Sequence, residues 1–203
     1  RDRSVSRGLG DVYKRQSAYS LIIEEGTPFS RKKLDLPDED TEYRMYEDTA
    51  AILGEYGFHQ YEISNYAKKG LECRHNKGYW QRTDYLGLGL GASSLVDHVR
   101  FSNTDNMEEY LRNSAFPEKI RCDRETLTEA DEMAEFMFLG LRMTEGVSVR
   151  EFEEYFGKNM ESIYGEVLKK HFALGMLKKK NDRIFLTRRG IHVSNGVMAD
   201  FLL

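Results

Sequence analysis

The sequence contains few cysteines and no long apolar run. Its longest apolar runs, such as Leu21-Ile22-Ile23, hold only a few residues, whereas a membrane-spanning helix needs roughly 20. We identify no secretory signal. The two cysteines, Cys73 and Cys122, are far apart and form no CxxC pair, so we expect reduced thiols in a cytoplasmic protein.

The composition is that of a folded protein. Of the 203 residues, 40% are hydrophobic and 32% are charged, which excludes a disordered tail and supplies apolar side chains for a core. The length suits one large domain or two small ones. The formal net charge of −4 argues against a general nucleic-acid binder.

Residues 1–16 are rich in arginine and show no apolar periodicity, and an apolar run begins abruptly at Ser17. This opening stretch resembles a translated library junction, so we expect it to be non-native and leave it out of the fold prediction. A native basic arm is the alternative.

The next part of the chain predicts an α/β layer. Residues 17–23 and 58–63 are strand-like apolar runs. Between them, residues 38–56 carry apolar side chains at helical spacing, with acids in the first turn and Gly57 at the stop. Because strand, helix and strand is the repeat of a parallel sheet, we expect parallel pairing here.

Two segments that follow have unusual composition. Residues 65–80 lack periodicity but are dense in Asn, Arg, His, Tyr and Trp, which is typical of a functional loop. Residues 84–95 alternate Gly and Leu, which suggests a strand whose backbone approaches something closely. A helix is predicted near residues 106–113.

A second domain is predicted over residues 121–203. Capping residues begin helices at Thr128 and Ser148, and a third helix covers about residues 160–174. Residues 176–186 predict a β-hairpin, and a short helix closes the chain. Three helices and a hairpin are typical of a winged-helix-like module.

This second domain divides its charge unevenly. Residues 158–189 hold nine lysines and arginines against three acids, and residues 123–154 hold ten acids against three arginines. A basic third helix and wing is one way to bind phosphates. The alternative is that the two faces satisfy one another or contact a neighbouring domain.

His75 stands four and five positions before Tyr79 and Trp80. No second histidine or cysteine pair lies at zinc-ligand spacing. An imidazole with flanking rings suits a flat, iron-bearing ligand, although a lone histidine beside aromatics is more often satisfied within a core. His59, His98, His171 and His192, or a methionine, are the other candidate ligands.

Gly87, Gly89 and Gly91 form a GxGxG string. No strand-to-helix turn with a downstream acid supports a dinucleotide loop. Two interpretations stay open, namely close backbone packing at a strand end and backbone approach to a nucleoside.

The stretch YEISNYAKKGLECRHNKGYWQRTDYLGLGLGASS closely resembles the radical-SAM haem chaperone family, whose members are similar to oxygen-independent coproporphyrinogen oxidase. SAYSLIIEEGTPF and LTEADEMAEFMFLGLRMTEGVS fit the same family. The resemblance covers residues 17–203, about the C-terminal half of a family member. It implies an α/β fold in which the C-terminal part of a partial TIM-like barrel, residues 17–120, precedes the small winged-helix-like domain, residues 121–203.

The family's HNxxYW element is the specific part of the resemblance. Here it comprises His75, Asn76, Tyr79 and Trp80. In the family this element is associated with haem binding, with the histidine as candidate axial ligand, so the resemblance favours His75 as the residue that binds the iron.

The resemblance also implies contacts with S-adenosylmethionine in the intact protein. In the related coproporphyrinogen dehydrogenase, the strand that matches residues 17–23 and the Gly-rich segment both approach this molecule. By that match, Ile22 and Ser93 are the contact positions, with Gly91 and Ala92 adjacent.

One family feature is absent from this chain. The CxxxCxxC motif that holds the four-iron (4Fe-4S) cluster does not occur, and reductive cleavage of S-adenosylmethionine needs that cluster. We therefore expect no radical chemistry from this chain alone. The intact parent is expected to bind haem, S-adenosylmethionine and the cluster, and to hand haem to acceptor proteins.

Two rival functions remain at this stage. One is a coproporphyrinogen III dehydrogenase of porphyrin biosynthesis, and the other is a winged helix that binds nucleic acid. A homodimer is a further expectation, for which the sequence offers no test.

Overall fold

The computed structural model describes residues 13–202, so most of the predicted junction lies outside the described residues. The chain divides into two compact units, which meet between Arg74 and His75. We call the part up to Arg74 unit 1 and the part from His75 onward unit 2. Among the described residues, no helix is long and apolar enough to cross a membrane.

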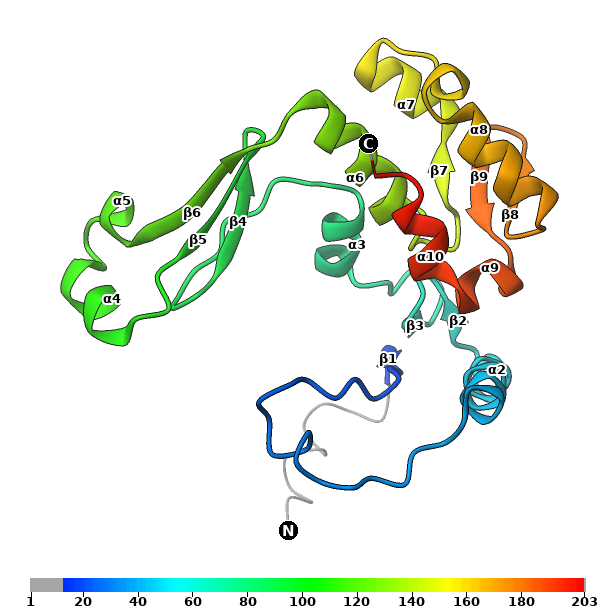
Figure 1. The fold of residues 1–203 in the computed structure, drawn as a ribbon, viewed down its shortest axis with the longest axis horizontal. Coiled ribbons are helices and arrows are strands. Elements are labelled where there is room, and N and C mark those ends of the chain that lie inside the picture. The colour runs from blue at the N-terminus through cyan, green and yellow to red at the C-terminus, as the bar shows by residue number, and fades with distance from the viewer. Residues whose placement is uncertain (1–12, 203) are drawn as a thin grey trace. The chain divides into compact units, whose positions relative to one another are not determined.

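Unit 1 contains one small sheet and one long helix (Figure 1). Its elements are β1 (Arg15–Ser17), α2 (Glu39–Glu55), β2 (His59–Gln60) and β3 (Asn65–Ala67). The strand order is β1-β3-β2, and both pairings are antiparallel. The predicted parallel pairing is therefore wrong for these strands.

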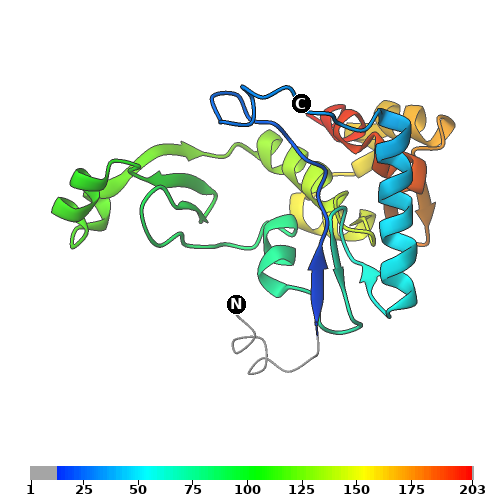
Figure 2. The ribbon, with the colours of Figure 1, turned by 90° about the horizontal axis from the view of Figure 1, so that it is seen from below.

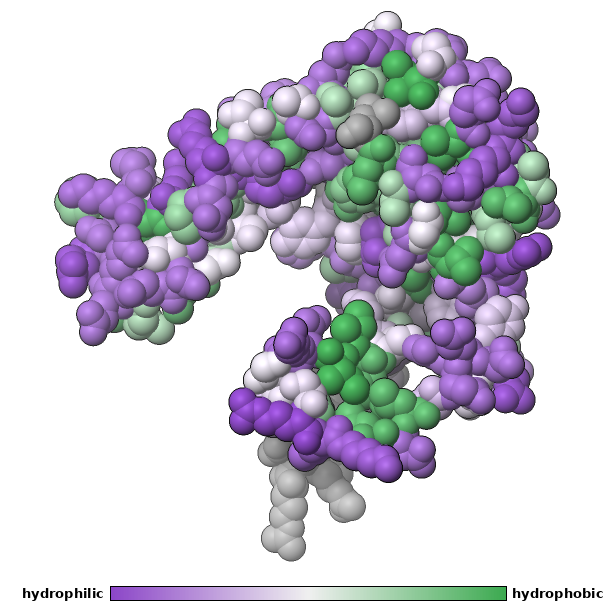
Figure 3. Space-filling model, in the orientation of Figure 1, coloured by the Kyte–Doolittle hydropathy of each residue, from purple (hydrophilic) through white to green (hydrophobic). Residues whose placement is uncertain are grey.

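The predicted strand over residues 17–23 is also wrong beyond its first residue. The pairing with β3 ends at Ser17, and one further bond joins the Ala18 amide to the Ser64 carbonyl at 2.9 Å. Beyond that point no strand within residues 13–202 pairs with the apolar run, and Ile22 is 76% exposed. A strand needs a ladder partner to satisfy its backbone, so this run stays irregular. Apolar side chains gather on this part of the surface in the lower part of Figure 3.

The helix prediction for residues 38–56 is confirmed. Asp38 is the N-cap of α2 and accepts a hydrogen bond from the Thr41 amide at 2.8 Å, as a capping aspartate does. None of the residues of α2 is buried. The Tyr46 hydroxyl donates to the Ile63 carbonyl at 3.0 Å and so ties the helix to the turn before β3.

The segment over residues 65–80 is not the loop that the sequence predicts. Its first part is β3, where Tyr66 and Ala67 are buried, and its last part is the helix α3 (Arg74–Trp80). Lack of periodicity misled the prediction because a three-residue strand and a seven-residue helix are too short to show a period.

Unit 2 continues with an antiparallel sheet of order β4-β5-β6. Its elements are β4 (Ser93–Val96), β5 (Val99–Asn103), α4 (Met107–Asn113), α5 (Pro117–Ile120) and β6 (Arg121–Thr126). Both ribbon views place α4 and α5 at the end of this sheet away from the helix that follows β6 (Figure 2). The helix predicted near residues 106–113 is confirmed, with Asn106 as its N-cap.

The strand predicted over residues 84–95 forms only at its end. Tyr85 makes an isolated bridge to Leu95, and residues 86–92 are irregular before β4. A Cβ on Gly87 would lie 2.3 Å from the Ser93 carbonyl oxygen. Close backbone packing, one of the two interpretations of the glycines, therefore holds at Gly87.

The C-terminal part of unit 2 confirms the three predicted helices and the hairpin. Its elements are α6 (Glu129–Gly140), β7 (Val147–Ser148), α7 (Val149–Phe156), α8 (Met160–Ala173), β8 (Leu177–Lys180), β9 (Arg183–Leu186), α9 (Arg188–His192) and α10 (Ser194–Ala199). The single closing helix that the sequence predicts is instead two short helices, α9 and α10. The strand β7 joins the hairpin to give the order β7-β9-β8. Thr128 and Asp131 form the predicted capping box of α6.

Aromatic rings form the core of this part. Phe152 and Phe201 are fully buried, and Tyr164 is almost so. Tyr164 stacks edge-on against both, with ring centroids 6.1 Å from Phe152 and 5.3 Å from Phe201. Such pairs add specific geometry to the burial of apolar area, so the segment after the last helix is held by the same core as α7 and α8.

Candidate haem-binding helix

The helix α3 carries all four residues of the HNxxYW element. The His75 side chain is exposed, while Asn76, Tyr79 and Trp80 are half-buried. Residues four apart lie on one face of a helix, and the Tyr79 hydroxyl is hydrogen-bonded to Nε2 of His75 at 2.9 Å. Their ring centroids are 4.7 Å apart. The structure therefore presents an accessible imidazole whose orientation is set by a phenol.

A second tyrosine supports this arrangement. The Tyr85 ring packs edge-on against Tyr79 with a centroid distance of 4.7 Å and an interplanar angle of 88°. Tyr79 is thus held between His75 and Tyr85. The sequence prediction did not include Tyr85, because it lies beyond the family motif.

Trp80 occupies a different environment from His75. The guanidinium of Arg142 lies over its ring, 4.3 Å from the centroid, a distance at which cation–π attraction operates. The indole nitrogen is buried, and none of the described residues accepts a hydrogen bond from it. The pocket that Trp80 lines has a volume of about 130 Å³ and does not include His75. A porphyrin is too large for that pocket, so a macrocycle bound by His75 would lie on the surface of α3.

Three of the other candidate histidines, His59, His98 and His171, are paired with carboxylates. Nε2 of His59 lies 2.8 Å from Glu72, and Nε2 of His171 lies 2.7 Å from Asp200. His98 is hydrogen-bonded through Nδ1 to Glu132. That hydrogen bond, aided by the carboxylate charge, raises the pKa of His98 above its ordinary value of 6.5.

The end of α3 is held by a cluster of charges that sequence reasoning missed. Arg82 donates to Glu132 at 2.8 Å and to Glu135 at 3.2 Å, both on α6. His98 and Arg100 approach the same two carboxylates. The three central side chains are at most 10% exposed. A buried arginine about 50 residues from its partners leaves no local pattern in the sequence.

The predicted S-adenosylmethionine contacts lie in different units. Ile22 is in unit 1 and exposed, whereas Gly91, Ala92 and Ser93 lie in unit 2 at the start of β4. Gly91 has a φ of +65°, a backbone conformation that favours glycine. These assignments stay predictions.

The residues present do not fit an iron–sulfur cluster. Cys73 and Cys122 are both free thiols, and one cluster needs several thiolates in a single site. Within residues 13–202, no group of three or more His, Cys, Asp or Glu side chains is arranged to hold a metal ion. We derive no radical step for this chain.

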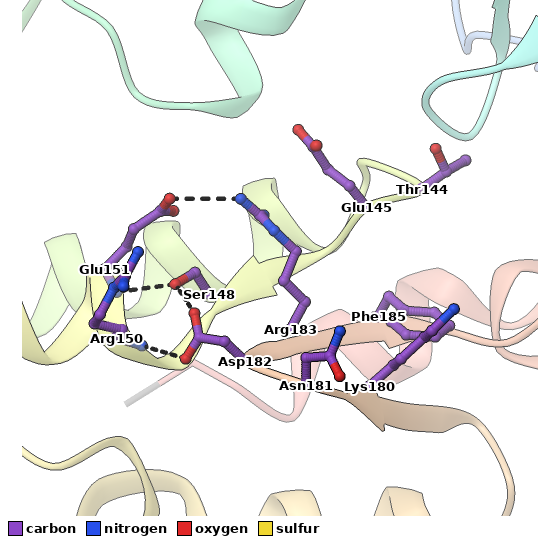
Figure 4. A pocket seen from close by; sticks show the side chains of 10 residues that line it. All are labelled: Thr144, Glu145, Ser148, Arg150, Glu151, Lys180, Asn181, Asp182, Arg183 and Phe185. Atoms are coloured by element: carbon purple, nitrogen blue, oxygen red, sulfur yellow. Dashed lines mark hydrogen bonds and ion pairs between the residues drawn. The ribbon is translucent and has the colours of Figure 1, made fainter.

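A polar pocket of about 470 Å³ lies beside β7 and β9 (Figure 4). It contains Ser148 and Asp182, which are hydrogen-bonded to one another. Asp182 also accepts from the Arg150 amide at 3.0 Å, and Ser148 accepts from the Glu151 amide at 3.0 Å. Both side chains therefore cap α7, and this pocket is explained by helix capping.

Comparisons with known proteins agree with these observations. Residues 127–193 match the HemN C-terminal domain. The chain is 37% identical over 189 residues to the Heme chaperone HemW of Lactococcus lactis, covering 91% of this chain and 49% of that protein. It is 34% identical over 208 residues to the Heme chaperone HemW of Bacillus subtilis, covering 99% and 54%.

A solved structure shows the same fold. The coproporphyrinogen III oxidase HemN from Escherichia coli, described as a radical SAM enzyme, matches with a TM-score of 0.75 and 16% identity. The match covers 98% of this chain and 50% of that one, which supports the predicted α/β fold class. The chain spans about half the length of the relatives that it matches. It belongs to the HemW and HemN family and corresponds to the C-terminal half of that family's members.

Proposed function

We propose that this chain is the haem-binding half of a haem chaperone, and that His75 on α3 binds the haem iron. Haem is the cargo in this proposal. The observation that carries it is the accessible His75 imidazole, hydrogen-bonded to a phenol on the same helix face. Two relatives named Heme chaperone HemW support the assignment.

The surroundings of His75 suit reversible haem binding. An imidazole nitrogen binds haem iron as an axial ligand. Because the His75 side chain is exposed, a haem bound by it would stay accessible to a second protein. Such a site favours transfer of haem to another protein over permanent retention. The acceptor would be a protein with a more enclosed haem site.

His75 is better suited to this role than His59, His98 or His171. Each of those three has one ring nitrogen hydrogen-bonded to a carboxylate, and His171 is buried as well. Iron binding through that same nitrogen would require the loss of its contact with the carboxylate. At His75 the corresponding change is the loss of one hydrogen bond to Tyr79, which is worth about 1 kcal/mol.

The test is a haem titration of the chain followed by the Soret band. His75→Ala is expected to weaken haem binding by at least about tenfold, a loss of about 1.4 kcal/mol. Tyr79→Phe keeps the ring, frees Nε2 and is expected to bind at least as tightly as the parent. His59→Ala is the matched control, since it removes an exposed histidine from unit 1. Equal binding by His75→Ala and the parent would reject the assignment.

The remaining functional proposals concern the whole protein. Free thiols at both cysteines suit the cytoplasm as its compartment. Nucleic-acid binding and a homodimer stay predictions. A gel-shift at two ionic strengths tests the former, since phosphate contacts weaken steeply with salt.

A further inference from the structure

Arg82 lies two residues after the end of α3 and connects this helix to α6. Its side chain is 9% exposed. The guanidinium bridges Glu132 and Glu135, which are three residues apart and therefore neighbours on one face of α6. Both glutamates lie within the matched HemN C-terminal domain. The helix that carries His75 is thus joined by a buried ion pair to the C-terminal domain.

The backbone at Arg82 shows that the turn itself does not favour arginine. Arg82 has a φ of +55°, a left-handed conformation that costs a residue with a Cβ about 1–2 kcal/mol. The Arg82 amide bonds to the Tyr79 carbonyl at 3.2 Å, and the Thr83 amide bonds to the Gly78 carbonyl at 2.9 Å. This is the Schellman end of a helix, where glycine is the common residue. The contacts of the side chain are what offset the strain.

A second contact acts in the same direction. Trp80, the last residue of α3, packs its ring under Arg142, which follows the C-terminal end of α6. One contact is made with α6 and the other with the residue after its C-cap, so the end of α3 is fixed at more than one point. The same two glutamates also contact the β4–β5 hairpin. Glu132 pairs with His98, and Glu135 pairs with Arg100.

We infer that Arg82 is a positioning residue for the haem-binding helix. By holding the end of α3 against α6, it fixes the direction in which His75 and Tyr79 face. The C-terminal domain then has a defined role, because it sets the geometry of the helix that binds haem. This inference rests on the proposed function of His75.

The test uses Arg82→Gly in the full chain. Glycine suits the left-handed turn, so this variant removes the guanidinium and leaves the helix end intact. Glu132 and Glu135 keep His98 and Arg100 as partners, which limits the cost of two buried carboxylates. If α3 of this variant holds His75 in the orientation that binds haem for only about a tenth of the time, the apparent haem affinity falls about tenfold.

Two further measurements separate positioning from general stability. The ligand-field signature of the bound iron, recorded by electron paramagnetic resonance, is expected to become heterogeneous in Arg82→Gly. Amide exchange over residues 75–80 is expected to speed up, while exchange in α8 is unchanged. Arg82→Lys keeps the charge but lacks the fork that reaches both carboxylates, so it should restore only part of the affinity. Arg150→Ala, which removes an exposed pair with Glu154, is the control and should change nothing.

The outcomes distinguish the inference from the proposed function. If His75→Ala abolishes binding while Arg82→Gly matches the parent in affinity and iron signature, the positioning role is wrong and the haem site stands. If His75→Ala has no effect, the haem site itself is wrong. If Arg82→Gly does not fold, Glu135→Gln decides, since it removes one charge and keeps the shape. Glu135→Gln should also weaken haem binding. An unchanged haem affinity together with an unchanged iron signature in this variant would overturn the inference.

Discussion

In the cluster of Arg82, His98, Arg100, Glu132 and Glu135, the role of each charged side chain depends on its partners. Glu132 accepts from both Arg82 and His98, and it is buried. A buried carboxylate requires such partners to remain charged. His98 itself is largely exposed, with 57% of its side chain accessible. Its interaction with Glu132 depends on pH because an imidazole changes its charge near neutral pH, whereas a guanidinium stays charged.

This dependence gives a prediction for His98. Its pKa is raised above 6.5 mainly by the hydrogen bond to Glu132 and also by Glu132 and Asp84 charge, while burial and Arg82 oppose the shift. A raised pKa in the folded state means that the stabilisation is complete below pH 6.5 and is lost as the pH rises through the raised pKa. His98 has a φ of +63°, and asparagine tolerates that conformation.

His98→Asn is therefore the suitable comparison. The parent should have the higher Tm at pH 6, and the difference should shrink toward zero as the pH rises. Thermal unfolding followed by circular dichroism from pH 6 to 9 measures it. A difference in Tm that stays constant over this range would contradict the prediction.

At the scale of elements, the turn between α6 and β7 depends on one glycine. Gly146 has a φ of +65°, and a Cβ there would lie 2.0 Å from the Ile184 carbonyl oxygen on β9. Gly157, which ends α7, has a similar φ of +63° but open space around it. An alanine would therefore have the same unfavourable backbone conformation at both positions, but only at Gly146 would its Cβ clash with another atom.

We predict that Gly146→Ala destabilises the chain more than Gly157→Ala. The left-handed backbone costs alanine about 1–2 kcal/mol at each site. Gly146→Ala adds the displacement of β9, for which overpacking typically costs about 1–3 kcal/mol more. Urea unfolding monitored by tryptophan fluorescence gives both values. Equal urea midpoints for the two variants would contradict the prediction, because they would mean that displacing β9 costs no free energy.

Helices were predicted better than strands because helix signals are local. The caps Asp38, Asn106 and Thr128 each bond to an amide three residues ahead, so the signal lies within one turn. The strand β6 was missed because nearly all of its residues are exposed, without alternation. The turn between β4 and β5 uses Asp97 and His98, both with positive φ, where asparagine and glycine are the usual signals.

At the scale of the whole molecule, two of the longest helices, α2 in unit 1 and α8 in unit 2, differ in how many of their residues are buried. None of the residues of α2 is buried, whereas α8 buries Met160, Tyr164, Leu168 and His171. Elements with few buried contacts open at low free energy. Unit 1 also exposes large apolar side chains after β1, as Figure 3 shows.

We predict that amide hydrogens of α2 exchange faster than those of α8 by at least about a hundredfold. The reason is that the free energy of local opening is about 3 kcal/mol lower for a helix without buried residues than for a helix packed in the core. Hydrogen exchange of the full chain, read by mass spectrometry of peptides, provides the measurement. Matched protection of both helices would show that α2 is covered in solution.

The sequence by itself determined the helices α6, α7 and α8, the hairpin of β8 and β9, and the family, and it favoured His75 as the candidate iron ligand. Those features depend on short-range bonds or on a contiguous motif, so they can be read along the chain. Only the tertiary structure decided that Tyr85 supports Tyr79, that Arg142 covers Trp80 and that Arg82 bridges Glu132 and Glu135. Tyr85 lies outside the motif, and the Arg142 and Arg82 contacts join residues that are distant in sequence. The free energy of a buried ion pair depends on which residues come together after folding.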